Sequence, residues 1–237
     1  MSKQETLTIK CSNCGNEVKF IMYSSINARL NPELKDMLIS DTLYKVECSK
    51  CGAKLKEIYS LLYHDPDKKI MIYGVPPDDV YRTINTFDML LKEYPDTYLG
   101  YTLRVVSSPT DLREKVITLD AGLDDRVVEI YKYLDVNSIN ELHEDAKATR
   151  GYFYIQDGKN MIEFDTTYYI NKEMSSENYE FLKKFYVNEI NASKNNYIID
   201  KDWAESVVLG DFESEETEEL SDDLKDIIKS IYEENYE

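Results

Sequence analysis

Histidine, tryptophan and glycine are scarce in this chain, and long apolar runs are absent from it. Its 237 residues include two histidines, one tryptophan and eight glycines. No apolar run approaches the roughly 20 residues that a helix needs to cross a bilayer. The N-terminus lacks the basic start and apolar middle of a secretion signal. We therefore expect a protein that makes no membrane contact and resides in the cytoplasm, where thiols stay reduced.

The common catalytic signatures are missing as well. The sequence contains no glycine-rich phosphate loop, no dinucleotide fingerprint, no nucleophile elbow and no His-Glu-x-x-His motif. These absences argue against nucleotide-dependent chemistry, serine hydrolysis of the α/β type and zinc peptidase chemistry. We assign no catalytic residue from the sequence.

Charge is strongly acidic and unevenly distributed. The formal net charge is −18, and residues 211–237 hold 12 acidic residues and 2 lysines, whereas residues 1–75 hold 11 basic and 9 acidic residues. An acidic protein repels phosphate backbones, so we expect no binding to nucleic acid. The end of the chain predicts an acidic tail with a short amphipathic helix, because four apolar residues follow the acidic run at helical spacing: Leu224, Ile227, Ile228 and Ile231. Such a helix would either fold back onto its own chain or dock on a partner.

The first segment predicts a β-rich domain over residues 1–77. Alternating stretches predict strands over 7–10, 17–22, 43–46, 55–62 and 69–73. Asn31-Pro32-Glu33 predicts the start of a short helix, with asparagine as its cap. Two consecutive prolines, Pro76 and Pro77, end the segment because proline interrupts a strand ladder.

Residues 78–210 predict a second, mixed domain. Helices are expected over 80–94, 109–122, 124–134 with an extension towards 143, and 178–190. Strands are expected over 98–106, 152–156, 160–164 and 197–199. A short closing element is expected over 203–209. Asp157-Gly158 is a hairpin turn signal. The expected fold is α+β: a zinc-ribbon-like β domain, then strand 98–106 and the hairpin packed on two or three helices, then the acidic helical tail over 211–237.

The four cysteines form two pairs with the same spacing. Cys11 and Cys14 are followed by a glycine, as are Cys48 and Cys51. Two intervening residues let both sulfurs of a pair reach one metal ion from a tight turn, and glycine permits the positive φ that such a turn needs. Four thiolates from two turns suit a closed tetrahedral zinc site. We therefore predict that these cysteines are the ligands of one structural Zn²⁺ ion.

Other uses of the four cysteines are weaker. Iron in a rubredoxin-like site takes the same ligands and is the less favoured ion. Redox-active dithiols are disfavoured because no thioredoxin-like context follows either pair. Two buried pairs without a ligand would be a rare coincidence. A catalytic zinc ion usually keeps one open position, which four cysteines do not leave.

The chain resembles the CpXC family of bacterial and archaeal proteins. Beyond the cysteines, the resemblance rests on residues 25–27, 31–35, 61–65, 69–73, 103–106, 112–116 and 122–129. It is clear up to about residue 150 and weak beyond it. The family often has proline after the first cysteine of a pair, where this chain has Ser12 and Ser49. The family is functionally uncharacterised, so the resemblance implies a fold but no activity.

Few other residues suggest chemistry. His64, beside Asp65, is either an acid–base group held by that carboxylate or a polar residue at the end of a strand, and the second interpretation is favoured. His143 is expected to be exposed on a helix. A charged set more often forms an ion-pair network than a polar groove; it comprises Arg104, Arg113, Glu114, Lys115, Asp124, Asp125, Arg126 and Glu129.

Three functions are compatible with these observations. The preferred one is a zinc-stabilised binding module that recognises another protein or its own copy. The first alternative is an enzyme with its active site between the two segments, using His64 and the charged residues from Arg104 to Glu129. The second is a nucleic-acid adaptor, which the overall charge disfavours, with a basic face made by Lys10, Lys19, Lys45, Lys50, Lys54 and Lys56.

Overall fold

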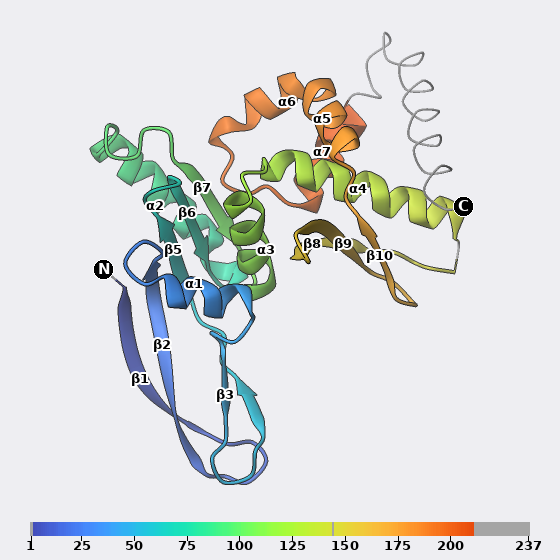
Figure 1. Ribbon diagram of the computed structural model, residues 1–237. Helices are drawn as coiled ribbons and strands as arrows, with labels where there is room; N and C mark the ends of the chain where they lie inside the picture. Colours follow the sequence, from blue (N-terminus) through green and yellow to red (C-terminus); the bar gives the residue numbers. More distant parts are fainter. Residues whose placement is uncertain (1, 144, 211–237) are drawn as a thin grey trace. The chain divides into compact units, whose positions relative to one another are not determined.

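The computed structural model describes residues 2–143 and 145–210, which divide into two compact units. Of the described residues, unit 1 extends to Gly122 and includes Asn195–Ile198, and unit 2 comprises Leu123–Lys194 and residues 199–210. The chain is α+β, as predicted (Figure 1). The predicted acidic tail over 211–237 lies outside the described residues.

Unit 1 is built on one mixed sheet. Among the described residues its strand order is β1-β2-β5-β6-β7. The pairs β1–β2 and β5–β6 are antiparallel, whereas β2–β5 and β6–β7 are parallel. The strands are β1 (Lys3–Lys10), β2 (Glu17–Asn27), β5 (Leu61–Asp65), β6 (Ile70–Gly74) and β7 (Thr102–Val106).

Helices cover both faces of this sheet. On one face α1 (Pro32–Ile39) and α3 (Pro109–Asp120) enclose a core that includes Leu38, Ile72 and Leu112. On the other face α2 (Val80–Glu93) packs Phe87 against β6 and β7. Consecutive residues of a strand point to opposite faces, so the residues of the interior strand β6 divide between the two cores.

A projecting arm extends from this sheet (Figure 1). Strand β2 pairs with β5 only over Ser25–Asn27, so the earlier part of β2 continues outward with β1 beside it. A short antiparallel hairpin, β3 (Lys45–Glu47) and β4 (Lys54–Lys56), extends in the same direction. We call residues 3–22 and 45–56 together the arm.

The division of the chain differs from the one expected at residue 77. Strand β7 pairs in parallel with β6, with Ile72 opposite Arg104, so one sheet spans that position. Helix α2 forms the crossover that a parallel pair requires. The prediction that the strand over 98–106 packs with the later hairpin is therefore wrong, because this strand completes the N-terminal sheet.

Unit 2 consists of helices packed on a small antiparallel sheet. Within its described part the strand order is β10-β9-β8, made of β8 (Arg150–Gln156), β9 (Lys159–Asp165) and β10 (Ile170–Glu173). The longest helix, α4 (Asp125–Leu142), packs on β8 and carries more buried residues than any other described element. The later helices are α5 (Ser176–Phe185), α6 (Val187–Ala192) and α7 (Lys201–Gly210).

Most predicted elements are present, and the differences have local causes. The predicted strand over 55–62 is divided between the end of β4 and the start of β5. The predicted helix over 178–190 is divided into two helices, α5 and α6, that meet at Tyr186. Residues 197–199 are not a strand, although Tyr197 accepts a hydrogen bond from the N–H of Val105. Strand β10 was not predicted, because alternation over four residues is too short to distinguish a strand.

One carboxylate connects three parts of unit 1. Asp120, at the end of α3, pairs with Lys35 of α1 at 2.5 Å and with Lys68 of the β5–β6 turn. Partial burial alone would raise the pKa of Asp120, but the two lysines outweigh it and hold that pKa below its ordinary value. The carboxylate therefore stabilises the folded state when it is ionised.

We expect Asp120→Asn to lower the free energy of unfolding by about 1 kcal/mol at neutral pH. A depressed pKa gives stability that is present above the unfolded pKa and is lost as the pH falls through the folded value. The variant should therefore approach the wild type below about pH 4. Urea denaturation across this range, with Asp67→Asn as the exposed control, measures the difference. A constant gap at every pH would contradict the ionic explanation.

Candidate metal centre

Two turns of the same geometry carry the four cysteines. In the first, the N–H of Gly15 donates to the carbonyl of Cys11, and in the second the N–H of Gly52 donates to that of Cys48, at 2.9 and 2.8 Å. Both glycines have positive φ, +69° and +70°, as the sequence predicts. The first turn joins β1 to β2 and the second joins β3 to β4, so both lie at the end of the arm.

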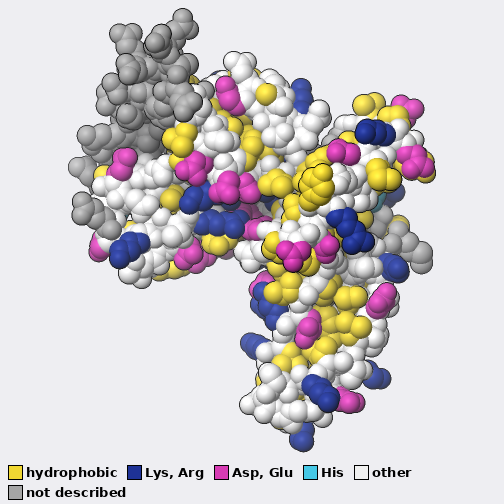
Figure 2. All heavy atoms as spheres, turned by 180° about the vertical axis from the view of Figure 1, so that it is seen from behind, with side chains coloured by type: hydrophobic (Ala, Val, Ile, Leu, Met, Phe, Trp, Pro, Cys, Tyr) yellow, Lys and Arg dark blue, Asp and Glu magenta, His cyan; other side chains and the backbone are white. Residues whose placement is uncertain are grey.

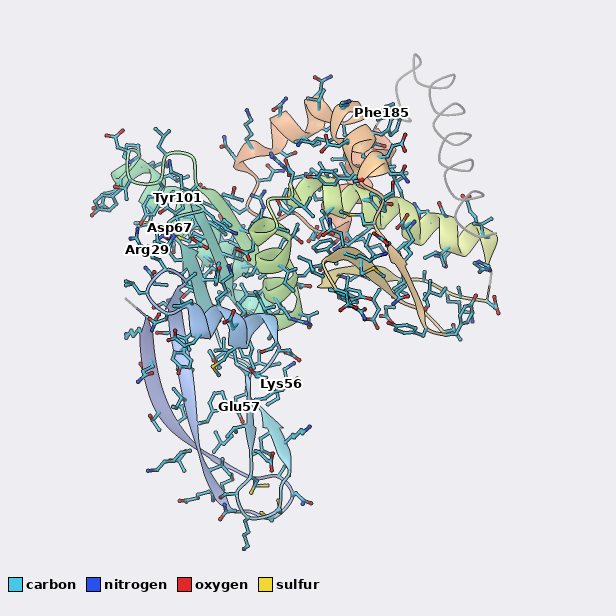
Figure 3. All side chains as sticks on the ribbon, viewed as in Figure 1. Arg29, Lys56, Glu57, Asp67, Tyr101 and Phe185 are labelled. Atoms are coloured by element: carbon cyan, nitrogen blue, oxygen red, sulfur yellow. The ribbon has the colours of Figure 1, made fainter. Side chains whose placement is uncertain are left out.

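The four sulfurs lie together, as the spacing predicts. All four Sγ atoms are within 4.8 Å of one another, and they gather at the end of the arm in Figure 3. The Sγ–Sγ distances are 3.6 Å between Cys11 and Cys51 and 3.7 Å between Cys14 and Cys48. Sulfurs at the corners of a tetrahedron around a zinc ion, with bonds of about 2.3 Å, are about 3.8 Å apart. The arrangement can therefore hold one metal ion, and the distances are far beyond a disulfide bond of about 2.05 Å.

Backbone N–H groups favour the thiolate form of the second pair. Hydrogen bonds from the N–H groups of Lys50 and Cys51 lower the pKa of Cys48 to about 6, despite burial of its sulfur. The N–H of Ala53 likewise lowers the pKa of Cys51. A low pKa favours metal binding, because the thiolate is the ligand and its proton must leave first.

Cys14 differs from the cysteines of the second pair because of its sulfur neighbours. A backbone hydrogen bond at Asn16 lowers the pKa of Cys14, but the three sulfur neighbours and burial outweigh this and raise it to about 12. Each proton lost from the group makes the next harder to remove. A divalent cation would remove this repulsion, and the side chain of Asn16 adds an Nδ2 contact at 3.9 Å to Cys48 Sγ.

The metal centre has a small apolar core of its own. Val18 of β2 and Leu55 of β4 pack with Cys11 and Cys48, all at most 9% exposed. This core is separate from the two larger cores of the sheet. A few side chains cannot hold two hairpins together in water, because the conformational entropy of the ordered residues exceeds what so little burial returns. The arm needs a further cross-link, which a metal ion would supply.

His64 lies near the end of β5, as the favoured interpretation has it, and does not form the alternative pair with Asp65. The two residues are adjacent on β5 and therefore point to opposite faces of the sheet. Asp65 is buried and accepts hydrogen bonds from the N–H groups of Asp67 and Lys68, which fixes the following turn. The Nε2 atom of His64 instead lies 3.1 Å from the hydroxyl of Tyr101, and partial burial lowers the pKa of His64. Figure 3 shows Tyr101 on the same side of unit 1 as Asp67.

The charged residues of unit 1 make structural contacts. Arg104 is 3% exposed, and its guanidinium donates to the carbonyls of Leu103 and Asn196. Arg113 of α3 donates to the carbonyl of Ile39, which ends α1, at 2.6 Å. Glu114 and Lys115 are buried on α3.

In unit 2 the charges organise the start of α4. Asp124 caps the helix by accepting from the N–H of Arg126, and its two oxygens also bind the guanidinium of Arg126 at 2.8 and 2.7 Å. The same guanidinium donates to the carbonyl of Ile190. Asp125 is buried in the first turn of the helix. His143 is exposed and directly follows α4.

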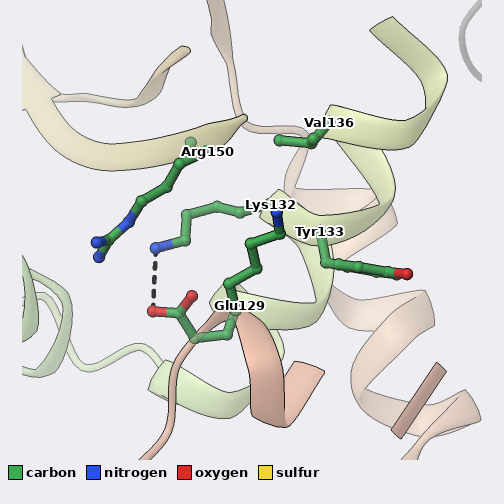
Figure 4. A pocket seen from close by; sticks show the side chains of 7 residues that line it. Glu129, Lys132, Tyr133, Val136 and Arg150 are labelled. Carbon is green, nitrogen blue, oxygen red and sulfur yellow. Dashed lines mark hydrogen bonds and ion pairs between the residues drawn. The ribbon is translucent and has the colours of Figure 1, made fainter. Parts of the chain in front are cut away.

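Glu129 lines a small pocket of unit 2. Its Oε1 accepts from Nζ of Lys132 at 3.0 Å, and both residues are buried (Figure 4). The pocket has room for about one water molecule. Its remaining lining comes from α4, β8 and α7: Tyr133, Val136, Arg150, Gly151 and Lys201. A volume of this size does not accommodate a substrate.

Sequence reasoning missed one buried pair. Asp135 of α4 is fully buried, and its Oδ1 accepts from Nζ of Lys172 on β10 at 2.9 Å. Its Oδ2 has no hydrogen-bond partner. Burial raises the pKa of Asp135 to about 6, although Lys172 opposes the shift. Since β10 was not predicted, the sequence offered no signal that these two residues meet.

The six lysines of the predicted basic face are all exposed on the arm. Two acidic residues are exposed among them, Glu17 and Glu47, and Glu57 is half-buried. In the view of Figure 2 basic side chains lie along the margins and at the end of the arm, with hydrophobic side chains between them. On this face the basic side chains are therefore separated from one another and interrupted by acids.

Comparison with known proteins identifies the N-terminal half. The family model described as CpXC protein matches residues 9–132, which is more than half of the chain. The match begins just before Cys11, includes both turns and strands β2 to β7, and ends within α4. No curated protein and no solved structure gives a significant match. None of the helices in the described part of the chain is long and apolar enough to span a membrane.

Proposed function

The chain belongs to the CpXC family, and from the four sulfurs at the end of its arm we propose that it is a zinc-stabilised module that binds another protein or its own copy. The observation that carries the proposal is the gathering of these four sulfurs within 4.8 Å of one another, between two hairpins with little core of their own. All four positions are protein ligands, so the ion would be structural.

Zinc is the ion that fits best. Four thiolates select zinc or iron among common metal ions, and tetrahedral geometry suits both. Zinc has no redox chemistry and imposes no further geometric preference, which suits a site whose work is to cross-link two hairpins. We place the protein in the cytoplasm, where the thiols would stay reduced for metal binding.

The arm suits a binding role because it presents an ordered surface that is not buried against the rest of unit 1. Strand β1 is exposed along nearly all of its length, and Leu7 and Ile21 are 39% and 47% exposed. A projecting, metal-fixed hairpin presents its surface in one conformation, which lowers the entropic cost of binding. The enzyme alternative is less well supported, since the carboxylate of Asp65 accepts from the N–H groups of the following turn and does not hold His64.

Elemental analysis of the purified full chain tests the metal. We expect about one zinc ion per chain, because the four sulfurs define one closed site. Cys14→Ser and Cys51→Ser should each lose most of the metal, whereas Ser12→Ala and Ser49→Ala, in the same two turns, should keep it. Iron with the red colour of a thiolate site, or two disulfides without metal, would overturn the assignment.

The binding role has its own test. Proteins retained by the immobilised wild type but not by Cys51→Ser would be identified in a lysate of the native host, with Ser49→Ala as the matched control. Specific partners, or self-association of the purified chain, are expected to depend on the metal. A chain that remains monomeric and retains no partner with the metal bound would contradict the binding role and leave the metal assignment intact.

A further inference from the structure

Strand β1 forms an open edge of the sheet in unit 1. Among residues 2–143 and 145–210 it pairs with β2 alone, and seven of its eight residues are exposed. The opposite edge is different, because the N–H of Val105 in β7 donates to the carbonyl of Tyr197 and residues 195–198 cover that strand. An edge strand of this length offers a row of backbone donors and acceptors for another strand.

The register shows which backbone groups of β1 face outward. Cys11 and Asn16 are opposite each other, and the N–H of Cys11 donates to Asn16 at 2.8 Å, so Cys11 points its backbone groups towards β2. Alternate residues of an antiparallel strand point the same way, so those at odd positions from Glu5 to Ile9 also face β2. The N–H and C=O groups of the residues at even positions therefore face the open edge: Gln4, Thr6, Thr8 and Lys10.

We propose that a second copy of this chain docks on β1 by antiparallel pairing of the two β1 strands about a two-fold axis. This inference rests on the proposed binding function and names its partner. A residue whose backbone N–H and C=O groups face the open edge must lie opposite a residue of the same kind in the second copy. This requirement excludes half of the possible pairing registers. The ladder of β1 with β2 is regular from Gln4 to Lys10, because its register shifts between Lys3 and Gln4. Within this regular stretch the register centred on Leu7 pairs all seven residues, more than any other register that remains.

This register is chemically self-complementary. Gln4 would meet Lys10 of the second copy, Thr6 would meet Thr8, and Glu5 would meet Ile9, so no two like charges are opposed. Paired threonines and paired apolar side chains are favourable across antiparallel strands. Leu7 would meet its own copy at a non-hydrogen-bonded position, where the Cα atoms are about 4.5 Å apart.

The central leucine extends an apolar surface already present. Leu7 is opposite Phe20 of β2, which is buried against the ring of Tyr59. Leu7 itself remains 39% exposed. Pairing about the two-fold axis would cover both copies of Leu7, so the interface would be the same patch on each chain. The near-neutral charge of residues 1–75 favours this contact over one through the acidic end of the chain.

A proline substitution tests the pairing without disturbing the fold. Thr6→Pro removes an N–H that faces away from β2, so the β1–β2 ladder should survive, as proline is tolerated at an edge. The dimer would lose one hydrogen bond from each copy, and we expect its dissociation constant to rise about tenfold or more. Thr6→Ala keeps the N–H and serves as the matched control.

Sedimentation velocity of the full chain over a range of concentrations gives the result. We expect a wild-type dimer, a dimer of Thr6→Ala and a largely monomeric Thr6→Pro variant, all with equal zinc content. A monomeric wild type, or a Thr6→Pro dimer as tight as the wild type, would overturn the proposal. A monomer that still retains a metal-dependent partner would overturn self-docking and leave the proposed binding function standing.

Single cysteines determine the register independently. Leu7→Cys should form an intermolecular disulfide under mild oxidation of the zinc-loaded protein, because the two residues face each other in the centred register. Thr6→Cys and Thr8→Cys should not, since each is displaced from its own copy by two residues. Rapid cross-linking of Thr6→Cys or Thr8→Cys with none for Leu7→Cys would contradict the register centred on Leu7.

Discussion

Cys48→Ser is expected to unfold the arm while the sheet beyond it remains folded. Structural zinc contributes about 10–16 kcal/mol in small peptides, which is comparable with the stability of a whole domain. Cys48 is 1% exposed, and the core around it contains only a few partners from four short segments. Without the metal, burial in that core does not offset the entropy of ordering two hairpins.

The two larger cores of unit 1 do not contain the metal centre, so they should persist. Hydrogen exchange should show lost protection over residues 9–22 and 45–56 and retained protection in β5, β6 and α3. The same pattern should follow chelation of the wild type, and Ser49→Ala should resemble the untreated wild type. Unchanged protection of the arm after complete removal of metal would show that the site is not structural.

Lys172→Met is expected to cost unit 2 about 3 kcal/mol or more at neutral pH, because it leaves the carboxylate of Asp135 buried without its partner. Asp135 is fully buried, and Lys172 is the donor to its Oδ1. Replacing both members, in Asp135→Leu with Lys172→Met, should recover most of this loss, since an apolar pair has no charge to desolvate.

The effect of Lys172→Met should depend on pH in a defined direction. Burial already raises the pKa of Asp135 to about 6 in the folded state, above the value of about 3.9 for an unfolded chain. A raised pKa gives stability that is fully present below the unfolded value and is lost as the pH rises through the folded value. The deficit of Lys172→Met should therefore be small near pH 4 and large above pH 6.

Urea denaturation followed by a probe in unit 2 measures this dependence. Asp135→Asn cannot ionise, so its stability should vary less between pH 4 and pH 7 than that of the wild type. Lys159→Met, which removes an exposed lysine paired with Glu173, is the matched control and should change stability little. An equal loss for Lys172→Met at both ends of the range would contradict ionisation of Asp135 as the cause.

Local signals in the sequence were read correctly where they depend on neighbouring residues. The spacing of the cysteines and the glycine after each pair gave both turns, with positive φ at Gly15 and Gly52. Ser108 caps α3 by accepting from the N–H of Asp111, and Gly122 follows that helix with φ of +76°. The start of α1 was also correct, although the side chain of Asn31 binds Glu33 and makes no cap hydrogen bond.

Contacts between segments far apart in the chain could not be predicted from the sequence in this way. The sequence by itself determined the two cysteine turns, most helices and the α+β class, because capping, turn geometry and apolar periodicity act over a few residues. Only the tertiary structure decided that β7 joins β6, that β1 is left at an edge, and that Asp135 meets Lys172. These depend on which elements pack together, and the free energy of that packing comes from residues far apart in the chain.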